Sequence, residues 1–182
     1  YLQYLTKLLT LSGLSQQDAQ AQAQRVYDAE AQISKASYDS QEYGDVEKIY
    51  NLYSLAEIQK QFRNVELQSV YTASGLAASE SIQVTDPGAM RAAASYFDEA
   101  HLDTLKAAAR TALLMSVSGS LSQDFLDAGF DFTRAYYGVD MSQSTEQIAA
   151  QQVQSLLADY LARAYAQKYF SPAAKADVEP MI

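Results

Sequence analysis

The chain has 182 residues, 48% of them hydrophobic, which is long enough to bury one core and predicts a single domain. Its 13 basic and 22 acidic residues give a net charge of -9, and the scattered basic residues argue against nucleic acid as a partner. The lack of cysteine excludes disulfides, thiolate metal sites and a cysteine nucleophile, and no apolar run approaches the roughly 20 residues of a membrane span.

The first two predicted elements form a helical hairpin. Apolar residues recur at helical spacing from the first residue, and Gly13 supplies the left-handed conformation that commonly ends a helix. Ser15 followed by Asp18 is typical of a capping box, so a second helix is expected to start there and to run to Ala36. The polar stretch 37–45 then predicts a turn.

Shorter helices are predicted through the middle of the chain, where capping residues recur. Asp45 and Asn64 are each expected to cap a helix, and Ser54 with Glu57 repeats the capping box. Asp86, followed by proline at the first helical position, marks another start. The expected helical ranges are 45–50, 54–62, 64–75, 86–97, 102–118 and 121–137.

Two helices are expected to present clear core-facing sides. The longest, over 145–170, carries its apolar set at steps of three and four: Val153, Leu156, Leu157, Tyr160, Leu161, Ala164, Tyr165 and Lys168. The helix over 102–118 is expected to turn inward Leu102, Leu105, Ala109, Ala112, Leu113 and Ser116. One short, isolated strand is predicted at 81–85. The pattern predicts an all-α, irregular multi-helix bundle of about eight helices with at most one short isolated strand.

Both ends of the sequence suggest a piece of a larger protein. The chain begins at Tyr1, inside an amphipathic pattern and without an initiator methionine. Near the other end, Ser171 and Pro172 are typical of a helix start, yet the sequence stops at Ile182. We therefore expect residues 1–182 to be one helical lobe, a fragment of a larger protein.

The strongest local candidate for a metal or acid/base site surrounds His101, the only histidine. On a helix, Asp98 and His101 are separated by three residues and Glu99 and Asp103 by four, so two ligands could share a face. The interpretation we favour is that these acids complement the exposed N–H groups at a break between two helices.

Two other patterns have both a functional and a structural interpretation. The acid pair Asp127 and Asp131 could bind a cation, but a solvated helix face explains it better, since no third ligand lies nearby in the sequence. The 14 tyrosines, among them Tyr136, Tyr137 and the pair Tyr165 and Tyr169, could line a cleft. Their helical spacing favours positions at the rim of a core, with the hydroxyl in water.

Several segments, taken in order, resemble the amino-terminal helical region of the neprilysin-like zinc metallopeptidases, the family that includes the bacterial oligopeptidase O type. The matching segments are Tyr1–Ser15 (YLQYLTKLLTLSGLS), Ile49–Gln59 (IYNLYSLAEIQ), Ile82–Pro87 (IQVTDP), Leu121–Phe132 (LSQDFLDAGFDF) and Tyr165–Lys175 (YAQKYFSPAAK). Each segment is weakly specific by itself, and their common order over nearly the whole chain carries the resemblance.

The resemblance implies a lobe without catalytic residues. In that family an H-E-x-x-H helix and a later glutamate hold zinc, and they lie downstream of this region. The segment Arg134–Tyr137 is similar to the family's substrate-binding N-A-Y/F stretch but lacks the asparagine, so that role is not carried over. The chain is thus expected to contain no catalytic, cofactor-binding or metal residue. Zinc would belong to the parent, a bacterial zinc metalloendopeptidase acting on oligopeptides.

The resemblance also implies a partner and a role. The lobe would pack with the carboxyl-terminal catalytic lobe of the same chain, cover the active-site cavity and limit substrate size. The alternative is a stand-alone helical protein-binding or scaffold module that holds a partner helix in a groove. A carboxylate-based metal enzyme of the helical-bundle type requires paired Glu-x-x-His motifs, which a single histidine excludes. Both bacterial cytoplasm and export fit the absence of cysteine.

Overall fold

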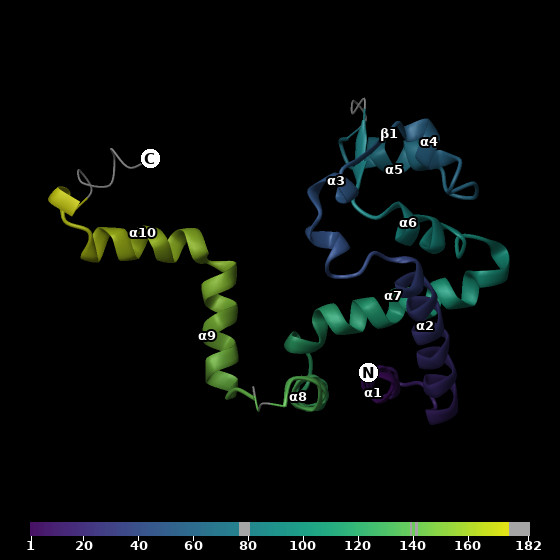
Figure 1. The fold of residues 1–182 in the computed structure, drawn as a ribbon. Helices are drawn as coiled ribbons and strands as arrows, with labels where there is room; N and C mark the ends of the chain where they lie inside the picture. The colour runs from purple at the N-terminus through teal and green to yellow at the C-terminus, as the bar shows by residue number, and fades with distance from the viewer. Residues whose placement is uncertain (77–80, 139, 141, 175–182) are drawn as a thin grey trace. The chain divides into compact units, whose positions relative to one another are not determined.

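The computed structural model describes residues 1–76, 81–138, 140 and 142–174. Contacts between residues group the chain into two units, Tyr1–Tyr137 and Gly138–Ile182, here called the amino-terminal and carboxyl-terminal units and described separately. The described residues form helices and one two-stranded sheet, which confirms the all-α class (Figure 1). None of the described helices combines the length and apolar character needed to cross a bilayer.

The predicted amino-terminal hairpin is confirmed. Helix α1 (Leu2–Leu11) and helix α2 (Gln16–Ala36) are joined at Gly13, whose φ of +100° lies in the left-handed region. Ser15 Oγ accepts a hydrogen bond from the Asp18 backbone N at 3.1 Å, as expected of an N-cap. Local signals therefore determine both the turn and the start of α2.

Shorter helices follow in the amino-terminal unit. They are α3 (Val46–Ile49), α4 (Leu55–Gln59), α5 (Leu67–Ala73), α6 (Pro87–Ala94), α7 (Leu102–Val117) and α8 (Gln123–Tyr137), with 3-10 turns η1 (Glu42–Gly44), η2 (Glu99–His101) and η3 (Ser118–Ser120). The caps predicted at Asp45, Ser54 and Asp86 form. The cap predicted at Asn64 is wrong, because α5 begins at Leu67 and Asn64 Nδ2 instead donates to the Phe97 carbonyl at 2.8 Å.

The strand expected at 81–85 forms as β2 (Ile82–Val84) and has a partner. It pairs antiparallel with β1 (Asn51–Tyr53), with Leu52 opposite Gln83. A strand of three residues is too short to show a period of two, so β1 was not visible as a pattern. The pairing joins two segments that lie far apart in the sequence.

The core of the amino-terminal unit lies where α1, α2 and α7 meet. Helix α2 packs against both α1 and α7 (Figure 1). The buried cluster comprises Leu5, Leu9, Ala19, Ala23, Val26 and Ala107. Alanines on facing helices let the backbones approach closely, so leucines of α1 and Val26 supply most of the buried apolar volume.

The inward face predicted for α7 is wrong. Leu113 is 62% exposed and Leu102 is 47% exposed, whereas Ala107 and Thr111 are buried. Thr111 Oγ1 satisfies its buried hydroxyl by donating to the Ala107 carbonyl at 3.0 Å. The helix thus packs through Ala107 and Thr111, and Leu114 is partly buried against the same cluster.

Asp86 holds the start of α6 against the segment that follows α2. Its side chain is only 8% exposed. Oδ2 accepts hydrogen bonds from the Tyr38 backbone N at 2.7 Å and the Tyr43 hydroxyl at 2.9 Å, and Oδ1 accepts one from the Ala89 backbone N at 2.8 Å. Burial raises the pKa of Asp86, but these hydrogen bonds outweigh it and hold the pKa below its usual value.

Asp86→Ala is expected to lower the free energy of unfolding by about 2 kcal/mol, because the Tyr38 N–H and the helix cap both lose their acceptor. Since the folded carboxyl has the lower pKa, this contribution is present above its unfolded pKa of about 3.9 and disappears as the pH falls through the folded pKa. Urea unfolding at pH 7 and pH 3 tests both points. An equal loss at the two pH values would contradict the role assigned to the carboxylate.

The carboxyl-terminal unit contains α9 (Thr145–Leu156) and α10 (Ala158–Tyr169). The single long helix predicted over 145–170 is therefore wrong: Leu157, with φ −114° and ψ 24°, interrupts it, and α2 is the longest helix described. Within this unit, none of the described residues of α9 or α10 is buried, so the two helices by themselves form no core. Ser171 Oγ accepts from the Ala174 backbone N at 3.2 Å as predicted, but the rest of that helix lies outside the described residues.

Candidate functional site

The cluster around His101 is a capping arrangement in the structure. Asp98 Oδ1 accepts the His101 backbone N–H at 2.9 Å and lies 2.8 Å from His101 Nδ1. The ring of Tyr96 meets the imidazole edge-on, with centroids 4.9 Å apart. The hydrogen bond from the His101 side chain, together with that from its backbone, lowers the pKa of Asp98. Asp98 is thus engaged at the start of η2, as the favoured interpretation expected.

The other acids of this cluster do not complete a metal site. Asp103 Oδ2 lies 3.5 Å from Arg25 Nη1, which joins α7 to α2 rather than to the imidazole. Among the described residues, no three His, Cys, Asp or Glu side chains gather where they could hold one ion. The donor set of this part of the chain therefore does not fit a zinc ion, which requires three or four such ligands.

The acid pair Asp127 and Asp131 has separate partners. Asp127 Oδ1 accepts a hydrogen bond from Gln123 Nε2 at 2.7 Å. Asp131 Oδ1 lies 3.3 Å from Arg134 Nη1. Each carboxylate thus has a polar partner within α8 itself. This agrees with the solvated helix face that the sequence analysis favoured over a cation site.

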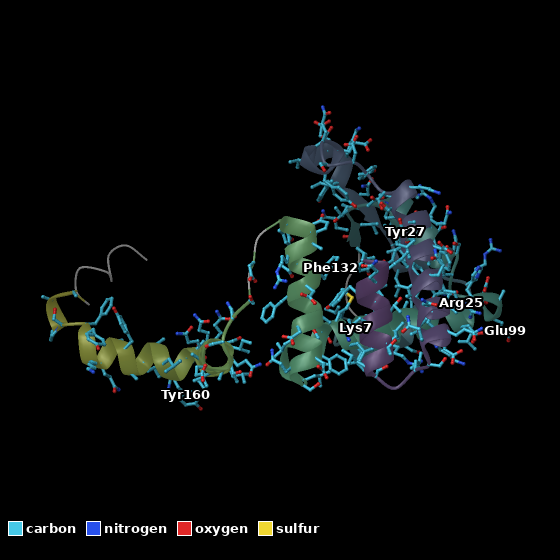
Figure 2. All side chains as sticks on the ribbon, turned by 90° about the horizontal axis from the view of Figure 1, so that it is seen from below. Lys7, Arg25, Tyr27, Glu99, Phe132 and Tyr160 are labelled. Atoms are coloured by element: carbon cyan, nitrogen blue, oxygen red, sulfur yellow. The ribbon has the colours of Figure 1, made fainter. Side chains whose placement is uncertain are left out.

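A hollow between α1 and α8 was not foreseen from the sequence. It has a volume of about 340 Å³ and is lined by Tyr1, Gln3, Tyr4, Lys7, Ala128, Asp131, Phe132 and Ala135. The Tyr4 and Phe132 rings stack with centroids 4.9 Å apart, and Lys7 lies on the opposite wall from α8 (Figure 2). Such a surface can hold an apolar side chain by stacking. The only sequence signal was the aromatic spacing at positions 1 and 4 and at 132 and 136.

Tyr1 also ties this hollow to α2. Its hydroxyl donates to Glu30 Oε1 at 3.1 Å. Partial burial, followed by this hydrogen bond, raises the pKa of Tyr1 to about 12. The phenol therefore stays protonated and acts as a donor, and the arrangement offers ring stacking rather than acid/base chemistry near neutral pH.

The other tyrosines singled out from the sequence are mostly exposed. Tyr136 and Tyr137 are 70% and 66% exposed, and Tyr165 and Tyr169 are 58% and 61% exposed. Tyr4 packs at the edge of the buried cluster formed by α1, α2 and α7, as the rim interpretation expected. The structure brings Tyr136 onto Phe132, with ring centroids 5.8 Å apart, and places Tyr165 beside Tyr169 at 4.8 Å.

Comparison with known families gives one match over the whole chain. The family model described as peptidase family M13, in its amino-terminal part, matches residues 1–182. The neutral endopeptidase of Lactobacillus helveticus is 27% identical over 175 residues, which are 96% of this chain and 27% of that protein. The chain thus spans little more than a quarter of the length of this curated relative.

Two solved structures of the zinc metalloprotease Zmp1 of Mycobacterium tuberculosis have a similar fold. The open-state structure gives a TM-score of 0.85 at 23% identity, covering 98% of this chain and 28% of that one. The inhibitor complex gives a TM-score of 0.82 at 22% identity, covering 99% and 28%. The resemblance to the neprilysin-like metallopeptidases stated from the sequence is confirmed by these matches together.

Proposed function

The chain belongs to peptidase family M13, and from this premise we propose that it is the non-catalytic helical lobe of a bacterial zinc metalloendopeptidase that hydrolyses oligopeptides. The match of the family's amino-terminal model to residues 1–182 carries the proposal. In it, the lobe packs on the carboxyl-terminal catalytic lobe of the same polypeptide, covers the active-site cavity and limits the size of the substrate.

The chemistry of the described residues supports placing catalysis elsewhere. A peptidase zinc needs three protein ligands and an open position for water, and the described part of the chain gathers no such set. We therefore assign no catalytic or metal-binding role to any residue named here. The zinc and the residues that polarise the scissile carbonyl are proposed to lie on the longer polypeptide, outside residues 1–182.

Peptidase assays of the chain and of the full-length polypeptide test this proposal. With zinc supplied, the full-length protein is expected to cleave a fluorogenic oligopeptide of about ten residues, to lose that activity with a chelator and to regain it with zinc. The chain by itself is expected to show no cleavage. Cleavage of unfolded proteins much longer than the oligopeptide would contradict the restriction of size.

His101→Ala in the full-length enzyme provides the matched control for the site assignment. Its kcat/KM is expected to stay within about twofold of the wild type, whereas removing a general acid or base costs about 10² to 10⁴. A loss of that larger size would place His101 in the catalytic machinery. A full-length protein without zinc-dependent cleavage would instead favour the binding or scaffold module.

A further inference from the structure

Helix α1 is bordered by two hollows that share residues. Gln3 and Lys7 line both the aromatic hollow between α1 and α8 and a larger groove of about 580 Å³ between α1 and α2. The two hollows therefore adjoin across α1, and both lie within the amino-terminal unit. A ligand longer than one side chain can thus occupy both at once.

Phe132 is the centre of an aromatic cluster in the first hollow (Figure 2). Its ring stacks on Tyr4 with centroids 4.9 Å apart, and the rings of Tyr1 and Tyr136 lie 5.9 and 5.8 Å from it. The volume of about 340 Å³ lies in the range of about 300 to 1,000 Å³ that is typical of small-ligand sites. Aromatic walls favour an aromatic occupant, because ring pairs contribute more than the burial of their area.

Lys7 places a cation without a counter-ion where the two hollows meet. Its side chain is exposed, and it forms no ion pair with any residue that the structure describes. Asp131, the other charged residue of the aromatic hollow, lies 3.3 Å from Arg134 Nη1 instead. On a chain of net charge −9, this ammonium group offers a carboxylate a favourable position beside aromatic rings.

The groove between α1 and α2 is lined mostly by uncharged polar side chains. Gln3 and Gln20 have no hydrogen-bond partner among the described residues, and a side-chain amide both donates and accepts, as a peptide group does. The hydroxyls of Thr6 and Thr10 donate to carbonyls of their own helix at 2.8 Å each, which leaves their oxygens as acceptors. Such a groove fits an extended peptide backbone.

We propose that this surface binds the carboxyl-terminal end of an oligopeptide whose last residue is aromatic. The aromatic side chain occupies the hollow beside Phe132, the free carboxylate pairs with Lys7, and the preceding backbone follows the groove along α2. The occupant is a peptide rather than a single aromatic acid, because the groove offers amide partners that a backbone uses. The inference rests on the proposed function, since the oligopeptide is the substrate of the full-length enzyme.

Peptides that differ only at the carboxyl terminus test the carboxylate position in the full-length enzyme with zinc supplied. A fluorogenic peptide of about ten residues that ends in phenylalanine is used as the free acid and as the amide. Lys7→Gln is expected to raise KM for the acid about threefold, as for an exposed ion pair, and to leave kcat and the KM of the amide unchanged. Lys35→Gln, at an exposed lysine of α2 that lines neither hollow, is the matched control and is expected to change neither peptide.

Phe132→Leu tests the aromatic hollow, because it keeps an apolar side chain and removes the ring. It is expected to raise KM about fivefold for the peptides that end in phenylalanine, acid and amide alike, and to leave a peptide that ends in alanine unchanged. Phe130→Leu makes the same change on α8 at a residue that does not line the hollow, and it is expected to have no such selective effect.

Direct binding is measured without cleavage by saturation-transfer NMR on the full-length protein. The probes are N-acetyltryptophan and its amide. The acid is expected to bind about threefold more tightly than the amide, and Lys7→Gln is expected to remove that preference. Phe132→Leu is expected to weaken the binding of both probes.

Separate results would overturn the inference and the proposed function. An unchanged ratio of acid to amide KM in Lys7→Gln, in an enzyme that cleaves both peptides, would refute the carboxylate position and leave the proposed function intact. Equal changes for Phe132→Leu and Phe130→Leu would show that no aromatic residue enters the hollow. A full-length protein that cleaves neither peptide would refute the proposed function, and the probes would still decide whether the surface binds an aromatic carboxylate.

Discussion

Replacing Leu9 by alanine is expected to lower the free energy of unfolding of the amino-terminal unit by about 2 to 5 kcal/mol. Leu9 is 0% exposed and lies in the cluster formed by α1, α2 and α7. The substitution removes buried apolar surface and leaves a cavity that surrounding helices fill only in part. Urea unfolding followed by circular dichroism measures the loss.

Leu113→Ala is the matched control, because it makes the same chemical change in the same unit at a side chain that is 62% exposed. Its effect is expected to stay within about 0.5 kcal/mol. The pair also tests the rotation of α7, since the apolar pattern of that helix predicted Leu113 on the inside. A loss for Leu113→Ala as large as that for Leu9→Ala would contradict the observed packing.

Gly88→Ala is expected to destabilise the amino-terminal unit by about 3 kcal/mol, at the upper end of the usual cost of overpacking. A Cβ atom at Gly88 would lie 2.3 Å from the Ala36 carbonyl oxygen, and that oxygen belongs to backbone at the end of α2. Neither α6 nor α2 can yield without breaking the Asp86 hydrogen bonds beside the contact.

Gly129→Ala, within a helix, is expected to have the opposite effect on stability. Gly129 lies in α8, and a Cβ atom there meets nothing within 4 Å. Alanine has the higher helix propensity, so this change is expected to raise stability by up to about 1 kcal/mol. Thermal unfolding of both variants compares them directly. Equal shifts in Tm would show that the close approach at Gly88 does not affect stability.

Helix starts were the most predictable part of the fold. The predicted caps Ser15, Ser54 and Asp86 all form, and each bonds to a backbone N–H only three residues away. Such information is local, so a sequence window contains it. Asn64 does not cap α5, which begins at Leu67, and its Nδ2 donates to a distant acceptor, the Phe97 carbonyl, which no window around position 64 includes.

The break between α9 and α10 shows the limit of periodicity. The apolar pattern continues through Leu157 without a proline or glycine, so it predicted one helix. Asp159 in the first turn of α10 was the available signal for a new start, since a carboxylate complements a helix N-terminus. The same pattern could not show that its apolar side is exposed, because periodicity identifies a face and not the surface that covers it.

The candidate sites also divide into those that the sequence could assess and one that only the structure shows. The sequence alone was enough to exclude a local metal site of the helical-bundle type, because one histidine and no cysteine limit the ligands, and the ordered segments were enough to indicate the family. The hollow between α1 and α8 depends on residues more than 100 positions apart, Tyr4 and Phe132 among them, and no local rule brings these together.

For this protein, the sequence by itself determined the helical class, most helix starts and the family, because capping, turn and periodic signals act within a few residues. Only the tertiary structure decided that α7 turns Ala107 and Thr111 inward, that β1 pairs with β2 and that Gly88 cannot carry a side chain. Each of these depends on the distance between two segments remote in the chain. That distance follows from how the helices pack, which no single segment encodes.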